Sequence, residues 1–237
     1  MKSAAVLFCL AVTLAKTAAQ DSNQSHDTNI WGAVEIGVNN SRASHVELFN
    51  GKDFSGWTFS MRTNADPALT WSITNGLIVC NGRPNGYART EKPYGDCKVT
   101  VEWRFTKAGN TGVCVFMQDR DANTPTNLIW GNSIECQGMH DHQGDFWLWG
   151  GATCAEPANN GRNGIKMPLP SSENPVGDWN TFQVVCKGGT VEIIVNGKSM
   201  NKITGCNNSS GYIGLQSEGG AWEARKVSIE PLSPDKM

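Results

Sequence analysis

The stretch from residue 133 to residue 147 gathers more groups able to move protons, bind a metal ion or stack on a sugar than any other part of the chain. It opens with residues that alternate between polar and apolar types: Ser133, Ile134, Glu135, Cys136 and Gln137. Because successive strand residues point to opposite faces, this run predicts a half-buried strand with a carboxylate and an amide on its polar face. The loop that follows carries two histidines, two aspartates and a Phe-Trp pair.

Glu135 is the first candidate for chemistry. A carboxylate on the inner face of a strand is costly unless it has a partner or a function, so Glu135 is predicted to be a catalytic base or a metal ligand. The alternative is a structural ion pair with Arg104. Gln137, on the same face, is predicted to hydrogen-bond a sugar hydroxyl, or else to close a loop by bonding its backbone.

The following loop offers further acid–base and metal-binding groups. His140, Asp141 and His142 could supply general acid–base catalysis or, together with Glu135, ligands for a divalent cation. The alternative is an exposed polar loop without a function. Asp145 is another catalytic candidate, or else it only shapes a turn. The sequence identifies no cofactor with certainty, and the one candidate cofactor is a divalent metal ion.

Residues from other parts of the chain complete the predicted site. Arg104 and Lys166 are candidates for stabilising an oxyanion, although Lys166 could equally be a solvated loop lysine. Gln216 and Glu218 are predicted to position the substrate, or else to hold a sheet edge. The tryptophans predicted to stack on a pyranose ring adjoin polar loops: Trp147, Trp149 and Trp222. Those predicted to lie in the core are Trp57, Trp71, Trp103 and Trp179.

The elements that must position these groups are predicted to be strands. Alternating or apolar runs occur at 71–73, 76–79, 99–105, 112–117, 182–186, 191–195, 212–216 and 223–229. Asn-Gly pairs at 75–76 and 196–197 predict tight hairpin turns. No long window has helical periodicity, and the 26 glycines favour many short strands. The pattern predicts an all-β sandwich of two antiparallel sheets, most simply a jelly roll.

The two ends and the charge set the domain organisation and exclude some partners. Residues 1–19 read as a signal peptide, 20–45 as a flexible leader, 46–232 as the folded domain and 233–237 as a tail, so a secreted or periplasmic protein without a transmembrane anchor is expected. Cleavage would leave 18 basic and 22 acidic residues, a weakly acidic balance that disfavours nucleic acid. Of the seven remaining cysteines, Cys186 and Cys206 flank a predicted hairpin and are predicted to form a disulfide.

Several motifs, in one order along residues 46–232, resemble the 3-keto-disaccharide hydrolase domain family of exported bacterial carbohydrate proteins. They are Leu48–Trp57, Thr90–Asp96, Glu102–Arg104, Asn110–Val113, Ser133–Gln137, Gly144–Trp147, Gly177–Asn180, Val195–Gly197 and Leu215–Gly219. The resemblance implies a concanavalin A-like jelly roll. It also implies cleavage of a 3-keto-disaccharide or another oxidised glycoside.

A ketone at C3 acidifies the hydrogen on C2, so one base can start an elimination that expels the group on C1, and water can then add to complete a net hydrolysis. Two other functions stay open at this point. One is a carbohydrate-binding module without catalysis, because one fold serves many functions. The other is a conventional glycoside hydrolase that pairs Glu135 with Asp141 or Asp145.

Overall fold

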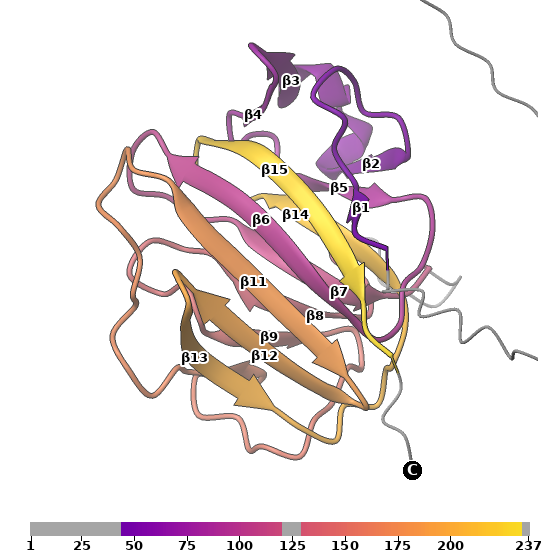
Figure 1. Ribbon diagram of the computed structural model, residues 1–237, viewed down its shortest axis with the longest axis vertical. Coiled ribbons are helices and arrows are strands. Elements are labelled where there is room, and N and C mark those ends of the chain that lie inside the picture. Colours follow the sequence, from indigo (N-terminus) through magenta and orange to yellow (C-terminus); the bar gives the residue numbers. More distant parts are fainter. Residues whose placement is uncertain (1–43, 120–128, 234–237) are drawn as a thin grey trace, which may run out of the picture. The chain divides into compact units, whose positions relative to one another are not determined.

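The computed structural model describes residues 44–119 and 129–233, which form a sandwich of two β-sheets (Figure 1). Residues 1–43 hold the predicted signal peptide and most of the leader and, like the end of the tail, lie outside the described residues, so these assignments stay predictions. Within the described part of the chain, no helix has the length and apolarity needed to cross a membrane.

The first sheet has the strand order β13-β12-β11-β6-β15-β4-β3, with β1 also paired to β15. Its strands are β1 (Val46–Glu47), β3 (Trp71–Thr74), β4 (Leu77–Cys80), β6 (Cys97–Phe105), β11 (Asn180–Lys187), β12 (Thr190–Val195), β13 (Lys198–Ile203) and β15 (Trp222–Pro231). Adjacent strands pair antiparallel throughout this sheet.

The second sheet has the order β10-β9-β8-β7-β14-β5-β2 and is also antiparallel. Its strands are β2 (Trp57–Met61), β5 (Gly86–Thr90), β7 (Gly112–Met117), β8 (Ser133–Gln137), β9 (Phe146–Trp149), β10 (Gly164–Ile165) and β14 (Tyr212–Ser217). Two 3₁₀ turns, η1 (Arg62–Asn64) and η2 (Pro67–Leu69), follow β2. The prediction of an all-β sandwich of two antiparallel sheets is confirmed.

The predicted hairpin turns occur where the Asn-Gly pairs are. Asn75 and Gly76 have φ angles of 53° and 75° between β3 and β4, and Asn196 and Gly197 have 50° and 80° between β12 and β13. Positive φ at both central residues matches the right-handed twist of paired strands, which is why Asn-Gly is favoured there.

The core lies between the sheets and contains the inward-facing residues of both. Trp103 of β6 and Trp222 of β15 are almost fully buried there, with ring centroids 6.1 Å apart. The prediction that Trp222 stacks on a sugar is therefore wrong, because the alternation of β15 turns it inward. The prediction of a core position for Trp179 is also wrong, since this ring is half-buried between the guanidinium groups of Arg104 and Arg225, each 4.6 Å from its centroid.

The predicted Cys186–Cys206 disulfide is absent, because both thiols are free. Cys186 is buried on β11, opposite Cys97 of β6, while Cys206 lies beyond β13. The hairpin between them therefore does not bring the two side chains together.

Candidate active site

Glu135 lies in the middle of the second sheet and is only 1% exposed. On β8, Ile134 and Cys136 point into the core, so Glu135 points to the opposite, outer face of the sheet. Its cross-strand neighbours are Cys114 on β7 and Trp147 on β9.

A small apolar cluster on this outer face excludes water from the surroundings of Glu135. Its buried members are Tyr87, Cys114, Met117, Ile129 and Trp130, and we call it the outer cluster. Trp149 and Tyr212 pack against it. The second sheet thus buries apolar residues on both faces, which explains why all five residues of β8 are buried.

Burial, and to a smaller extent the nearby charge of Glu218, raise the pKa of Glu135 to about 8. The indole Nε1 of Trp149 opposes this shift by donating a 2.6 Å hydrogen bond to Glu135 Oε2. The adjacent Gln216 amide also lowers the pKa. At neutral pH, Glu135 is therefore mainly the neutral acid.

Glu218 follows the end of β14 and is half-buried. Burial raises its pKa to about 6, while a 3.0 Å hydrogen bond from Asn110 Nδ2 to Glu218 Oε2 acts in the opposite direction. At neutral pH, Glu218 is therefore mainly ionised. Two carboxyl groups with separated pKa values commonly divide the acid and base roles of a reaction.

Both carboxyl groups line one cavity of about 230 Å³, which we call the acid-pair cavity. Its described lining consists of Asn110, Glu135, Gln137, Met139, Trp147, Trp149 and Glu218. Of the residues predicted for the site, the structure brings together Glu135, Gln137, Trp147, Trp149 and Glu218.

Two tryptophans form one wall of the acid-pair cavity. The rings of Trp147 and Trp149 are stacked, with centroids 6.1 Å apart and planes 16° from parallel. Trp149 is fixed by its hydrogen bond to Glu135, and a side chain at Gly164 of the neighbouring β10 would lie 3.1 Å from the Trp147 ring. The half-buried Trp147 ring suits the apolar face of a pyranose.

Gln216 lies beside Glu135 and does not line the acid-pair cavity. It is fully buried, and neither of its amide atoms has a hydrogen-bond partner of good geometry among the described residues. A Cβ atom on Gly112 would be 2.6 Å from Gln216 Oε1 and 3.2 Å from Glu135 Cγ. The absent side chain of Gly112 therefore lets Gln216 approach Glu135, so Gln216 contacts the acid.

Gln137 combines the two roles considered for it. Its Oε1 accepts a 3.0 Å hydrogen bond from the backbone N–H of Met139, which closes the loop after β8. The same side chain lines the acid-pair cavity, where it can also meet a ligand.

Asp145 makes hydrogen bonds that connect the loop after β8 to the segments on either side of β10. It is 2% exposed, and its Oδ1 accepts a 2.8 Å hydrogen bond from the backbone N–H of Met167. Its Oδ2 lies 3.2 Å from His142 Nδ1 and 3.5 Å from Asn160 Nδ2.

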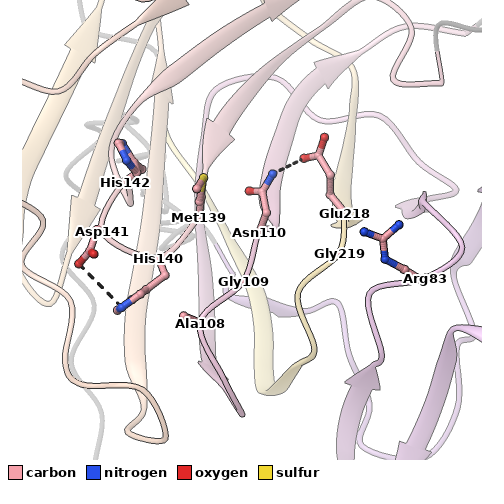
Figure 2. Close-up of a pocket in the computed structure, with 10 residues that line it drawn as sticks. All are labelled: Arg83, Ala108, Gly109, Asn110, Met139, His140, Asp141, His142, Glu218 and Gly219. Atoms are coloured by element: carbon pink, nitrogen blue, oxygen red, sulfur yellow. Dashed lines mark hydrogen bonds and ion pairs between the residues drawn. The ribbon is translucent and has the colours of Figure 1, made fainter.

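A larger cavity of about 480 Å³ adjoins the acid-pair cavity and shares Asn110, Met139 and Glu218 with it (Figure 2). Asp145 lines neither of the two cavities, so it is not placed to pair with Glu135.

His140 belongs to a separate cluster with Asp141 and Glu173. Ligand atoms of these three residues lie within 4.8 Å of one another, so they could hold a divalent cation. Glu173 already binds His140 Nδ1 and accepts a 2.8 Å hydrogen bond from the backbone N–H of Asp141. The cluster does not include Glu135, contrary to the shared metal site considered from the sequence.

Residues 44–230 match the family described as the 3-keto-alpha-glucoside-1,2-lyase-like domain. The chain belongs to this family. The family and its fold support a carbohydrate-active function for the chain. Among curated proteins, none matches the sequence significantly.

Solved structures with the same fold include enzymes and a binding module. A protein of Parabacteroides distasonis, provisionally named a glycosyl hydrolase, has 20% sequence identity and a TM-score of 0.58 over 80% of this chain and 94% of its own. The β-glucanase of Bacillus licheniformis has 12% sequence identity and a TM-score of 0.54, over 82% of this chain and 100% of its own. The carbohydrate-binding module CBM66 of Bacillus subtilis has 15% sequence identity and a TM-score of 0.52, over 74% of this chain and 95% of its own. These likenesses confirm the concanavalin A-like jelly roll.

Two predicted members of the site in this lyase-like domain lie elsewhere. Arg104 is on the outer face of the first sheet, where it binds Glu223 at 2.7–2.8 Å and covers Trp179. Since Glu135 is on the outer face of the second sheet, the two point away from each other, and both the Arg104–Glu135 ion pair and a role for Arg104 beside Glu135 are excluded. Lys166 is exposed and lines a different hollow.

The sequence reasoning missed Asn110 and Met139, which line the acid-pair cavity, and Glu173, which binds His140. Asn110 begins one of the motifs that resemble the family, which was the available signal. Glu173 lies in the long connection between β10 and β11, and no spacing in the sequence linked it to the loop after β8.

Proposed function

We propose that this chain is an exported enzyme that cleaves glycosides of 3-keto sugars by elimination, with water addition completing a net hydrolysis. The observation that carries the proposal is the pair Glu135 and Glu218, whose pKa values are raised to about 8 and about 6 in one cavity with a tryptophan wall. Family membership supports the same substrate class.

Glu218 is the base in this proposal. A ketone at C3 lets the C2–H bond break toward an enediolate, and a base works best when its pKa is near the working pH. Glu218 is mainly ionised near pH 7 and still basic enough, with its pKa near 6, to take this proton. The predicted base was Glu135, but its higher pKa keeps it protonated in the same conditions.

Glu135 is the hydrogen-bond donor to the oxygen on C3. When the C2 proton leaves, negative charge develops on that oxygen, and a neutral buried carboxylic acid can donate to it without itself carrying charge. The hydrogen bond from Trp149 holds one carboxyl oxygen of Glu135, which leaves the other free to face the substrate.

The elimination balances with Glu218 alone moving the proton. The electron pair of the C2–H bond forms the C1=C2 double bond, and the C1–O bond breaks with its electrons going to the leaving oxygen. Glu218, now protonated, gives the proton to that oxygen and is ionised again. Addition of water across C1=C2 then yields the free 3-keto sugar.

Matched disaccharides, one oxidised at C3 and one not, test the proposal. Product detected by mass from the 3-keto form alone is the expected result. In D₂O, deuterium should also enter C2 of the returned substrate or of the product, because proton removal precedes loss of the leaving group. Saturable binding with no product from either sugar would contradict the proposal and favour a binding module.

A conventional glycoside hydrolase is the second candidate, because two carboxyl groups with separated pKa values also suit direct hydrolysis. The second carboxyl would then be Glu218 in place of Asp141 or Asp145. Turnover of an unoxidised glycoside by the purified protein would favour this candidate.

A further inference from the structure

Four of the seven cysteines in the described residues stand opposite one another in two pairs, although all seven carry free thiols. In the first sheet, Cys97 of β6 and Cys186 of β11 are register partners, and we call them the inner pair. Residues directly opposite in an antiparallel pair have Cα atoms about 4.5–5.5 Å apart, and a disulfide bond needs about 4.4–6.8 Å. The backbone therefore already holds the inner pair at the spacing of a disulfide.

The side chains of the inner pair also meet. Both are buried in the core between the sheets, and as direct partners they point to the same side of their sheet. A hydrogen bond with the Cys97 side chain, together with burial, raises the pKa of the Cys186 thiol. The two sulfur atoms are thus in contact across the strands.

Cys154 and Cys206 form the outer pair, where two segments outside the named strands run antiparallel. Two backbone hydrogen bonds flank this pair, from Asn207 to Thr153 at 3.2 Å and from Ala155 to Thr204 at 2.8 Å. A Cβ atom on Gly205 would lie 3.2 Å from that of Ala155, so these two residues face each other. Their neighbours Cys154 and Cys206 are then opposite as well. Burial, and next the nearby Cys154 thiol, raise the pKa of Cys206 to about 11.

The outer pair lies where a bond would join the two sheets. Cys154 is in the connection that follows β9 of the second sheet, and Cys206 follows β13, the edge strand of the first sheet. Both residues are half-buried, whereas the inner pair is almost fully buried. The other described cysteines have no cysteine as a register partner: Cys80, Cys114 and Cys136.

We propose that an oxidising environment converts the inner and outer pairs into two disulfide bonds, Cys97–Cys186 and Cys154–Cys206, which stabilise the sandwich, and leaves the other three described cysteines as thiols. Such an environment is the one that an exported protein meets. The oxidant is a small disulfide such as oxidised glutathione. One cysteine thiolate attacks it and releases one glutathione thiolate, and the partner thiolate then displaces the second glutathione. For each bond, the protein loses two thiol hydrogens and one glutathione disulfide is reduced to two thiols.

The test equilibrates the full chain with reduced and oxidised glutathione, alkylates the remaining thiols in denaturant and maps linked peptides by mass spectrometry. Cys136 and Cys154 share one tryptic peptide, so a second protease that cleaves after Asp141 and Asp145 separates them. We expect linked peptides for the inner pair and for the outer pair, and alkylation of the other three described cysteines. Alkylation of all seven, or linked peptides of any other pairing, would overturn the inference.

Cys206→Ala should lose the outer bond alone, so that Cys154 becomes alkylated while the inner bond stays. Cys80→Ala is the matched control and should keep both bonds, because Cys80 is opposite Trp71 and Trp222. A bond lost in Cys80→Ala, or Cys154 still linked in Cys206→Ala, would contradict the assigned pairs.

Thermal unfolding measures the stabilisation. Oxidation should raise the Tm of wild type by at least about 8 °C relative to the reduced protein, because each bond closes a long loop in the unfolded chain. In Cys206→Ala the rise should be about half as large. An unchanged Tm on oxidation would overturn the stabilising role. These measurements do not use turnover, so their outcome is independent of the reaction proposed above.

Discussion

Exchanging each carboxyl of the acid pair for an amide should have unequal effects. Glu218→Gln removes the base, and loss of a general base typically lowers kcat by about 10²- to 10⁴-fold. Glu135→Gln keeps a group of the same shape that can still donate to the oxygen on C3. We expect it to lose roughly 10-fold, less than the 10²- to 10³-fold typical when an oxyanion donor is removed. Glu135→Met, which has no donor, should show that larger loss.

The dependence of kcat/KM on pH separates the two roles. In wild type the active form has Glu218 ionised and Glu135 neutral, so kcat/KM should rise with pH through about 6 and fall through about 8. An amide does not titrate in this range. In Glu135→Gln the fall near pH 8 should therefore disappear, while the rise near pH 6 remains.

Initial rates on a 3-keto-disaccharide, measured from pH 5 to pH 9, supply both readouts. The reasoning would be refuted if Glu135→Gln were as inactive as a base-deficient enzyme while Glu218→Gln kept most of its turnover. It would also be refuted if the fall near pH 8 persisted without the Glu135 carboxyl, because another group would then be losing the essential proton.

Three further variants, and a stability measurement on Glu135→Gln, test other parts of this account. Trp149→Phe removes the indole donor that lowers the pKa of Glu135, so the fall in kcat/KM should move to higher pH. Gly112→Ala places a methyl group 2.6 Å from Gln216 Oε1, and we expect a loss of about 1–3 kcal/mol in the free energy of unfolding together with reduced kcat. The folded-state pKa of Glu135 lies above its unfolded value, so its contribution to stability is present below about pH 4.5 and is lost as pH rises toward 8. Urea unfolding at pH 8 should therefore find Glu135→Gln more stable than wild type by at least about 1 kcal/mol. Arg104→Ala should change kcat/KM less than about 2-fold, because this side chain lies on the other sheet.

Local patterns predicted the strands and the tight turns, because both depend on neighbouring residues. The Asn-Gly pairs at 75–76 and 196–197 form the predicted turns, and the run 112–117 is β7 with those bounds. The alternation in 133–137 also placed Glu135 and Gln137 on one face of β8. Each of these features needs only the two-residue period of a strand and the preference of Asn and Gly for positive φ.

The membership of the site could be predicted only in part, because it depends on the order of strands in each sheet. Glu218 reaches Glu135 because β7 lies between β8 and β14, which are some 75 residues apart in the chain. The alternation of residues 99–105 predicts that Arg104 points outward, as Glu135 does. That pattern shows that a residue points outward, but not on which side of a sandwich its sheet lies.

The outer cluster gives the acid pair its separated pKa values. Glu135 lies opposite Cys114 of this cluster and is almost fully buried, whereas Glu218 follows the end of β14 and is half-buried. Desolvation is the largest cause of both shifts, so the difference in burial is the main source of the difference in pKa, and the charge of Glu218 adds to the shift of Glu135. A polar residue in the outer cluster, as in Met117→Gln, would admit water and bring the two pKa values closer together. The rise and the fall of kcat/KM with pH would then lie closer together, although neither carboxyl had been changed. That result would show that the packing of this face controls the pKa values on which the reaction depends.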